Sequence, residues 1–442
     1  MSPVPNPEAD LIIEAAWIVP VVPRDAVITD HALIINNKRI EAIVPINEAK
    51  GLSCKRRVEL SNHILMPGFV NAHGHTPMSL FRGLADDIPL QEWLEDRIWP
   101  LEGKYVSREF VRDGAMLTLA EIIRSGTTCF ADNYFFPDEV AKVANEASLR
   151  AQLASPVLDF PTVWAQDADE YISKTTQLHD DYRSSELVSI AFGPHAPYTV
   201  SDKPLQRIAA LAEELDVPIH IHMHENAREV SDALASDGRR PLARMADLGL
   251  VSPRLLCVHA TQLVDEEIQL LSQQGASVIH CPSSNLKLAS GLCEVDKLLK
   301  RGVNVALGTD GAASNNDLDM FGEMHLMALL GKAVAQDAAA VSAQQALEIA
   351  TLGGARALGM ERDIGSLEVG KFADICAVSL DHLSLRPMNN PVSHLVYASN
   401  GSVVSHVWCA GSLLLEDGEL QTLDLTLIKE RAAHWQAKFA QA

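Results

Sequence analysis

The sequence lacks the features that mark several common protein classes. None of its seven cysteines forms a C-x-x-C pair, which argues against a zinc knuckle or a redox dithiol. An odd, scattered set is typical of reduced thiols inside a cell. No run approaches the roughly 20 uninterrupted apolar residues that span a bilayer. The N-terminal stretch has neither the basic region nor the apolar core of a signal peptide. These absences predict a cytoplasmic protein that does not enter membranes.

Basic residues are also scarce relative to acidic ones. The chain has 36 Lys and Arg against 58 Asp and Glu, a formal net charge of −22. Because such a surface repels a phosphate backbone, we do not expect a nucleic-acid partner. The composition leaves open whether copies associate as a homo-oligomer. With 442 residues, 47% of them hydrophobic, the chain can form a barrel of roughly 250–300 residues and a second domain.

Short β-strands are predicted at both ends of the chain. At the C-terminal end, residues 373–420 contain three apolar strands, separated by turns at Gly411 and at Asp417-Gly418. We therefore expect one small β-sandwich formed by residues 1–66 and 367–442, the latter ending in a helix over Leu425–Ala442. The N-terminal strands are predicted at Leu11–Ile13, Trp17–Val22, Ala32–Ile35, Arg39–Ile43 and Arg57–Leu60.

The middle of the chain alternates apolar bursts with helical segments, the pattern of βαβ units and a parallel sheet. Eight bursts predict an α/β fold, a (β/α)8 TIM barrel over residues 67–366. An open doubly wound sheet is the alternative, but no G-x-G-x-x-G follows the first strand, which disfavours a dinucleotide-binding version of it. The bursts are 64–73, 127–133, 150–158, 188–195, 218–225, 254–261, 276–283 and 304–311; helices are expected at 112–125, 203–215, 265–275, 294–301 and 343–358.

Most of these bursts end in a residue that can bind a metal or carry a proton. In a (β/α)8 barrel the C-terminal strand ends form the active site, so residues far apart in sequence converge there. The residues are His73 and His75, His195, His222 to Glu225, His259, His280 and Asp310.

The His73-x-His75 pair places both imidazoles on one face of a strand. Two histidines near a turn more often only cap a strand. Together with His222, His259 and Asp310 at matching strand ends, however, they predict a metal site.

The run from His220 to Glu225 contains three alternating histidines, and one metal needs only one of them. We predict that His222 is the ligand and that Glu225 reaches the substrate from the following loop. His220 is expected deeper in the barrel, and His224, like His280, is expected in a second-shell or structural role.

Asp310 lies in LGTDGAASNN, where an aspartate before glycine is more often a turn former. After strand eight it would instead supply an oxygen ligand opposite His73. Three histidines and one carboxylate suit Zn²⁺, or another borderline ion such as Fe²⁺. Strand four ends in His195, and no lysine is available there to bridge two metals. We therefore expect one divalent metal per chain.

Five segments, MPGFVNAHGH, HMHE, VHA, HCPSSNLKLASG and LGTDGAASNN, resemble the amidohydrolase superfamily. Within it, the chain is most similar to the 5′-methylthioadenosine/S-adenosylhomocysteine deaminases. The segments GPHAPYTV and WPLE narrow the resemblance to this branch and its neighbours, such as triazine hydrolases and guanine deaminases. The resemblance covers essentially the whole chain. It implies a metal held by His73, His75, His222 and Asp310.

The same resemblance implies catalytic and substrate-binding roles. Glu225 would contact the purine ring and protonate N1, and His259 would orient the attacking water. Asp310 would accept the water's proton. Glu102, which would otherwise be taken for a solvated helix residue, matches the glutamate that holds the ribose hydroxyls, and His195 matches a histidine that lines the nucleoside pocket.

The implied function is hydrolytic deamination of a small nucleoside, 5′-methylthioadenosine, S-adenosylhomocysteine or adenosine. Relatives that accept S-adenosylhomocysteine can place arginines after strand three. Here residues 154–161 contain no arginine, and the next one is Arg183. Because an unpaired carboxylate is costly to bury, this favours 5′-methylthioadenosine. The alternatives are a guanine, cytosine or triazine deaminase or chlorohydrolase of the same superfamily, and a non-catalytic barrel that serves as a binding or scaffold protein.

Overall fold

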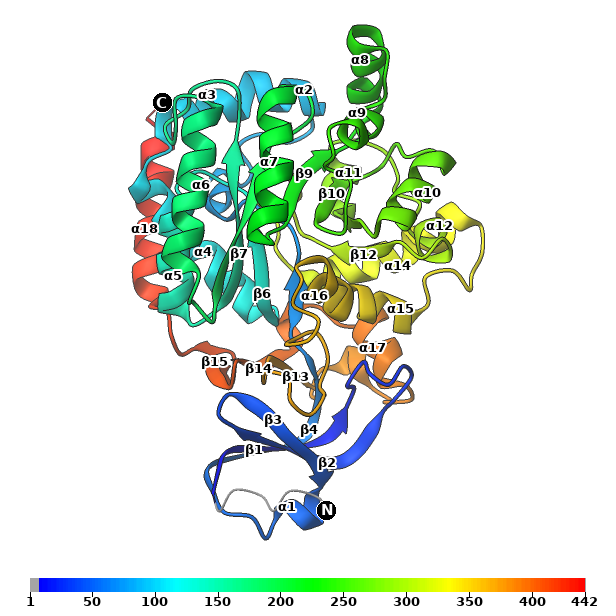
Figure 1. Cartoon of the computed structure of the whole chain (residues 1–442). Coiled ribbons are helices and arrows are strands. Elements are labelled where there is room, and N and C mark those ends of the chain that lie inside the picture. Colours follow the sequence, from blue (N-terminus) through cyan, green and yellow to red (C-terminus); the bar gives the residue numbers. More distant parts are fainter. Residues whose placement is uncertain (1–7, 442) are drawn as a thin grey trace.

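The computed structural model describes residues 8–441 and has two eight-stranded sheets (Figure 1). One is a parallel barrel with the strands in sequence order, which confirms the predicted (β/α)8 fold. Its strands are β5 (Phe69–Asn71), β6 (Thr127–Asp132), β7 (Arg150–Val157), β8 (Val188–Pro194), β9 (Ile219–Met223), β10 (Leu255–His259), β11 (Ser277–His280) and β12 (Asn304–Leu307).

The barrel closes between its first and last strands. The N–H of Ala72 donates to Leu307 O (2.9 Å), and the N–H of Asp310 donates to His73 O (3.0 Å). Gly308 permits this approach, since a Cβ there would lie 2.9 Å from the Cβ of His73. Closure of the barrel therefore brings His73 and Asp310 together.

Helices surround the barrel and include each of the five predicted ones, with ends shifted by up to four residues. The segment predicted as one helix at 343–358 is a continuous run with a π-helical turn in its middle. The helices are α4 (Arg108–Arg124), α5 (Pro137–Ala147), α6 (Ala168–Tyr182), α7 (Asp202–Leu215), α8 (Ala227–Asp237), α9 (Pro241–Asp247), α10 (Asp265–Gln274), α12 (Val295–Lys300), α14 (Met320–Ala335), α15 (Ala343–Glu348), η3 (Ile349–Gly353) and α16 (Gly354–Ala357).

Short helices follow the barrel strands at the cavity side or connect the outer elements. Those nearest the strand ends are η1 (Thr76–Phe81), α2 (Leu90–Glu92), η2 (Trp93–Ile98), α3 (Trp99–Tyr105), α11 (Pro282–Lys287) and α13 (Ala312–Asn315). The others are α1 (Ile46–Ala49), η4 (Leu383–Leu385), α17 (Pro391–Tyr397) and η5 (Gly401–Val403).

The second sheet combines strands from both ends of the chain, as predicted. Its order is β16-β15-β14-β13-β4-β1-β2-β3, and β4 pairs with β13 where Met66 faces Cys376. Leu33 of β2 packs in the same hydrophobic cluster as Trp408 of β14, so strands from the two ends of the chain share a core. Its strands are β1 (Ala9–Ile18), β2 (Ile28–Asn36), β3 (Arg39–Pro45), β4 (Cys54–Pro67), β13 (Ile375–Ser379), β14 (Val404–Cys409), β15 (Ser412–Glu416) and β16 (Glu419–Leu420).

Two strand predictions in the N-terminal part of the chain were wrong in detail. Trp17–Val22 is not a separate strand, because β1 runs unbroken to Ile18. The apolar burst 64–73 belongs to two sheets: β4 ends at Pro67, and β5 begins the barrel at Phe69. Gly68 separates them and leaves no room for a side chain against Thr128.

The C-terminal helix α18 (Leu425–Phe439) packs along the outside of the barrel against α4 (Figure 1). The Trp435 indole N–H donates to the buried Asp113 carboxylate (2.8 Å), and Arg431 donates to the same oxygen (2.9 Å). At the end of α18 the Phe439 ring lies 5.0 Å from the Tyr105 ring of α3. The last helix therefore contacts a helix that borders the cavity.

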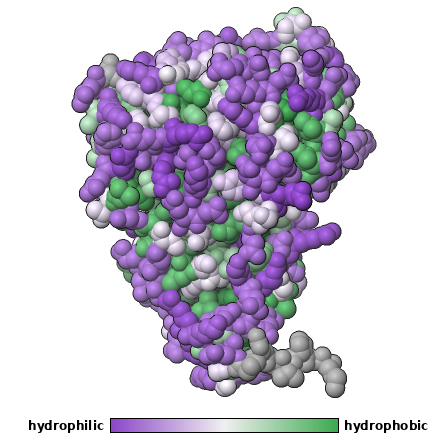
Figure 2. Space-filling view, turned by 60° about the vertical axis from the view of Figure 1, so that its left-hand side comes forward, coloured by the Kyte–Doolittle hydropathy of each residue, from purple (hydrophilic) through white to green (hydrophobic). Residues whose placement is uncertain are grey.

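The face drawn in Figure 2 is dominated by hydrophilic side chains, with hydrophobic ones in scattered patches. This distribution is expected of a folded globular chain, whose polar and charged side chains mostly lie at the surface. Across residues 8–441, every helix is too short or too polar to cross a bilayer.

Candidate functional site

A cavity of about 260 Å³ opens at the C-terminal ends of the barrel strands. Its walls bring together candidates from five different barrel strands or the segments that follow them. His73 lies just beneath it and is fully buried. The predicted residues in its lining are His75, Glu102, His195, His222, Glu225, His259 and Asp310.

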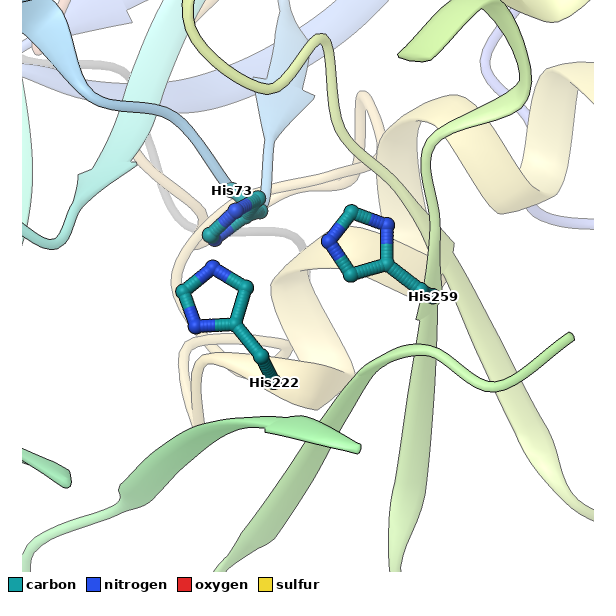
Figure 3. Close-up of side chains that lie close together, drawn as sticks. All are labelled: His73, His222 and His259. Carbon is teal, nitrogen blue, oxygen red and sulfur yellow. The ribbon is translucent and has the colours of Figure 1, made fainter. Parts of the chain in front are cut away.

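Two overlapping groups of potential metal ligands share His73. Ligand atoms of His73, His222 and His259 lie within 4.8 Å of one another, and so do those of His73, His75 and Asp310. The first three rings face a common space from separate strand ends (Figure 3). Nε2 of His73 and Nε2 of His75 each lie 3.3 Å from Oδ1 of Asp310. Each of the four predicted ligands therefore belongs to one of two groups that share His73.

Two of these imidazoles are oriented by backbone carbonyls. Nδ1 of His75 lies 2.6 Å from Asn133 O, and Nδ1 of His222 lies 2.7 Å from His195 O. A carbonyl oxygen only accepts hydrogen bonds, so each Nδ1 carries the hydrogen. Nε2 is therefore the ring nitrogen that remains to bind a metal in both residues, the arrangement of a metal-binding histidine.

His73 is held from below by His220. Nδ1 of His73 lies 2.8 Å from Nε2 of His220, whereas Nε2 of His73 is buried and makes no hydrogen bond within residues 8–441. Burial lowers the pKa of His73 to about 4, and it lowers the pKa of His222 well below its usual value. Neutral imidazoles with an unpaired buried nitrogen are suited to bind a cation. The donors thus fit a divalent metal.

The Asp310 carboxylate is fixed by three hydrogen bonds. Oδ2 accepts from Oγ of Ser284 (2.6 Å) and Oγ of Ser314 (3.0 Å), and Oδ1 accepts from the N–H of Gly311 (2.8 Å). Although burial opposes the charge, His73 and His75 hold the pKa of Asp310 well below its usual range. Its oxygens therefore remain acceptors at neutral pH.

Strain accompanies this geometry. Asp310 and His259 have left-handed φ values of 62° and 72°, which non-glycine residues rarely adopt. Such conformations cluster at functional sites, where the surrounding structure enforces them.

Glu225 and His259 face each other across the cavity. Oε1 of Glu225 lies 3.8 Å from Nε2 of His259, whose Nδ1 lies 2.8 Å from Oδ1 of Asn285. Burial raises the pKa of Glu225. The Glu229 carboxylate accepts from the N–H of Glu225 (2.8 Å) and of the preceding residue (2.9 Å), which fixes the backbone that aims Glu225.

His224 and His280 support their neighbours rather than line the cavity. Nε2 of His224 accepts from the N–H of Leu242 (3.1 Å), and its Nδ1 lies 3.5 Å from the Glu267 carboxylate. Nδ1 of His280 lies 3.4 Å from the Asn285 side-chain amide. Asn285 therefore connects His280 to His259.

Glu102 and His195 occupy the wall above the cluster. Glu102 comes from α3 and is half-buried, and burial raises its pKa to about 7 against the opposing effect of Tyr134. The His195 ring centre lies 5.1 Å from that of His222, and its Nδ1 lies 3.1 Å from Oγ1 of Thr199. Glu102 is thus a cavity residue and not a solvated one.

Sequence reasoning missed the residues that hold these groups. Ser284 and Asn285 lie in HCPSSNLKLASG, Ser314 lies in LGTDGAASNN, and Asn133 directly follows β6. Their polar side chains immediately after barrel strands are a usable signal. Their particular partners required the structure, because each hydrogen bond joins different strand ends.

The chain is similar to several known proteins. Residues 64–414 match the model of the amidohydrolase family. A 5-methylthioadenosine/S-adenosylhomocysteine deaminase of Teredinibacter turnerae is 51% identical over 430 residues, 97% of each chain. A 5′-deoxyadenosine deaminase of Methanothermobacter thermautotrophicus is 43% identical over 375 residues, 85% of this chain and 87% of that one. The crystal structure of an adenosine deaminase from Xanthomonas campestris with bound zinc superposes with a TM-score of 0.98 at 48% identity, covering 99% and 100%.

Proposed function

The chain belongs to the amidohydrolase family, and on that basis we propose that it hydrolyses 5′-methylthioadenosine at C6, releasing ammonia and the inosine analogue. The observation that carries the proposal is one cavity that joins the His and Asp cluster to Glu225, His259 and Glu102 in a mainly apolar wall. Relatives named as adenosine-type deaminases span nearly the whole chain, which supports the same reaction.

We propose that His73, His75, His222 and Asp310 hold one divalent ion per chain. Zn²⁺ is supported by the zinc-bound adenosine deaminase of similar structure, and Fe²⁺ is the alternative. A divalent ion at such a site supplies Lewis acidity that makes water nucleophilic at neutral pH. One ion is favoured over two because both ligand groups share His73 and because the described lining of the cavity contains no lysine.

The remaining steps are assigned to side chains. Glu225 donates a proton to N1 of the adenine, and burial, which raises its pKa, favours the protonated acid that this step needs. His259 orients the attacking water. Asp310 accepts the proton of that water as its oxygen bonds to C6. It then returns that proton to the amino nitrogen as the C6–N bond breaks and ammonia leaves. The proton of the C6 hydroxyl passes to the Glu225 carboxylate, which leaves a carbonyl at C6 and restores the acid.

Glu102 is proposed to accept hydrogen bonds from the ribose hydroxyls, and His195 to line the nucleoside pocket. Among the described residues that line the cavity, none is a lysine or arginine. Arg183 follows α6 and precedes β8, so it lies at the opposite end of the barrel. A homocysteine carboxylate would therefore lack a cationic partner, which favours the methylthio substrate.

The test is ammonia release from 5′-methylthioadenosine, S-adenosylhomocysteine, adenosine, 5′-deoxyadenosine and the free bases adenine and guanine. We expect kcat/KM for 5′-methylthioadenosine to exceed that for S-adenosylhomocysteine by about a hundredfold, the effect of a few kcal/mol of unpaired charge. Comparable values would refute the preference. Activity on free bases alone would favour the guanine-deaminase alternative, and no turnover with bound metal would favour a binding protein.

A further inference from the structure

The residues that line the cavity fall into three levels according to their solvent exposure. The innermost groups are buried: His259 is 1% exposed, Asp310 5% and Glu225 8%. Glu102 lies at an intermediate level. The large hydrophobic residues at the outermost level of the lining are 37–51% exposed.

The outer level consists of Trp99, Phe160, Val163 and Tyr198, which we call the apolar rim. Four large side chains at one mouth, each exposed by more than a third, are an unusual concentration on a charged surface. Beneath the rim the wall continues apolar with Trp93, Leu94, Ile98 and Leu158. The rim therefore extends an apolar wall outward from the level of Glu102 to the solvent.

The loop that carries two rim residues is held in place by hydrogen bonds. Oγ1 of Thr162 lies 2.5 Å from the Tyr171 hydroxyl, and the N–H of Thr162 donates to Ala165 O (2.8 Å). At its start the Asp159 carboxylate accepts from the N–H of Ser201 (2.8 Å). Phe160 and Val163 are thus presented by an ordered segment.

We propose that the apolar rim is a binding surface for extended neutral 5′-thioether groups, so that the substrate class includes adenosines with 5′-alkylthio chains longer than methylthio. The inference rests on the proposed function, because it places the base at the buried level and the ribose beside Glu102. The 5′ group then points toward the rim. Since the rim is open to solvent, a longer chain meets apolar surface and no closing wall.

The experiment compares 5′-methylthio-, 5′-propylthio- and 5′-butylthioadenosine. Each methylene that stays on the rim contributes up to about a fourfold gain. The butylthio group has three more methylenes, so we expect its kcat/KM to equal that of the methylthio compound or to exceed it by up to about sixtyfold. A lower value for the butylthio compound would overturn the proposal, because it would mean that the mouth is closed to longer chains.

Measurements of binding affinity test this inference independently of the deamination reaction. The dissociation constants of 5′-methylthioinosine and 5′-butylthioinosine, measured by calorimetry, test the rim without turnover. Binding of the butylthio compound at least as tight as that of the methylthio compound supports the rim, even if no ammonia is released. Turnover of 5′-methylthioadenosine together with weaker butylthio binding would refute the rim and leave the deaminase activity intact.

Phe160→Ala is the variant that addresses the surface directly. We expect it to lower the butylthio-to-methylthio ratio of kcat/KM by about three- to tenfold, the effect of the lost apolar contact. Val264→Ala is the matched control, since Val264 is 38% exposed and lies outside the lining of the cavity. An unchanged ratio in Phe160→Ala would overturn the assignment of this surface.

Discussion

The floor of the cavity and its mouth are built by different means. At the floor, candidate side chains at strand ends are hydrogen-bonded to residues from other strand ends, as in the contact of His222 with His195 O. At the mouth, Glu102 comes from α3, a helix with no fully buried residue. The barrel thus fixes the chemistry, and separate segments above it determine which substrates reach it.

The floor and the mouth of the cavity also differ in how their carboxylates are held in position. The Asp310 carboxylate is fixed by hydrogen bonds from two serines and a backbone N–H. Glu102 depends on packing, because Tyr105, one turn later in α3, contacts Phe439 of the C-terminal helix. We therefore expect substitutions at the floor to affect the metal or kcat, and those behind the mouth to affect KM.

The largest effect is expected from removal of His73, which both ligand groups share. Wild-type protein should contain about one divalent ion per chain, and His73→Ala should retain less than about a tenth of that after dialysis. Activity should fall by about 10⁴ or more, because water activation is lost. Elemental analysis and ammonia release measure both.

His31→Ala is the control, since His31 lies in β2 of the second sheet. It should leave metal content and rate unchanged. Two ions per active wild-type chain, or an active His73→Ala protein with full metal content, would contradict the proposed ligand set.

An intermediate effect is expected at Glu225, which is on the cavity floor but outside the ligand groups. Glu225→Gln keeps the size and polarity of the side chain but removes the acidic proton. Metal content should be unchanged, whereas kcat should fall by about 10²–10⁴. If the variant loses its metal and regains normal turnover when metal is added back, Glu225 supports the metal site and is not the proton donor.

The smallest effect is expected behind the mouth. Phe439→Ala removes the ring that packs on Tyr105 and so loosens the helix that carries Glu102. An aromatic contact contributes about 0.5–1.5 kcal/mol, so KM for 5′-methylthioadenosine should rise about two- to tenfold with kcat nearly constant. Steady-state kinetics test this, with the exposed Gln436→Ala on the same helix as control. A fall in kcat with constant KM would mean that α18 influences the floor.

Much of the fold and the candidate site could be predicted because the signals are local. An apolar burst that ends in a histidine or aspartate identifies a barrel strand and one candidate residue in the cavity, as at His222 and Asp310. The support for those residues is not local. Ser284 donates to a carboxylate on the neighbouring strand end, and His220 contacts His73 across the barrel. In the sequence alone, neither Ser284 nor His220 can be distinguished from an ordinary buried polar residue.

The pairing of β4 with β13 has a consequence for how the chain folds. Met66 faces Cys376, and the entire barrel lies between them in sequence. The entropy lost in bringing such distant residues together is least once the barrel has already shortened the path between them. Barrel formation should therefore precede completion of the second sheet. Until then the edges of β4 and β13 are unpaired, and at high protein concentration a second chain could supply the missing strand.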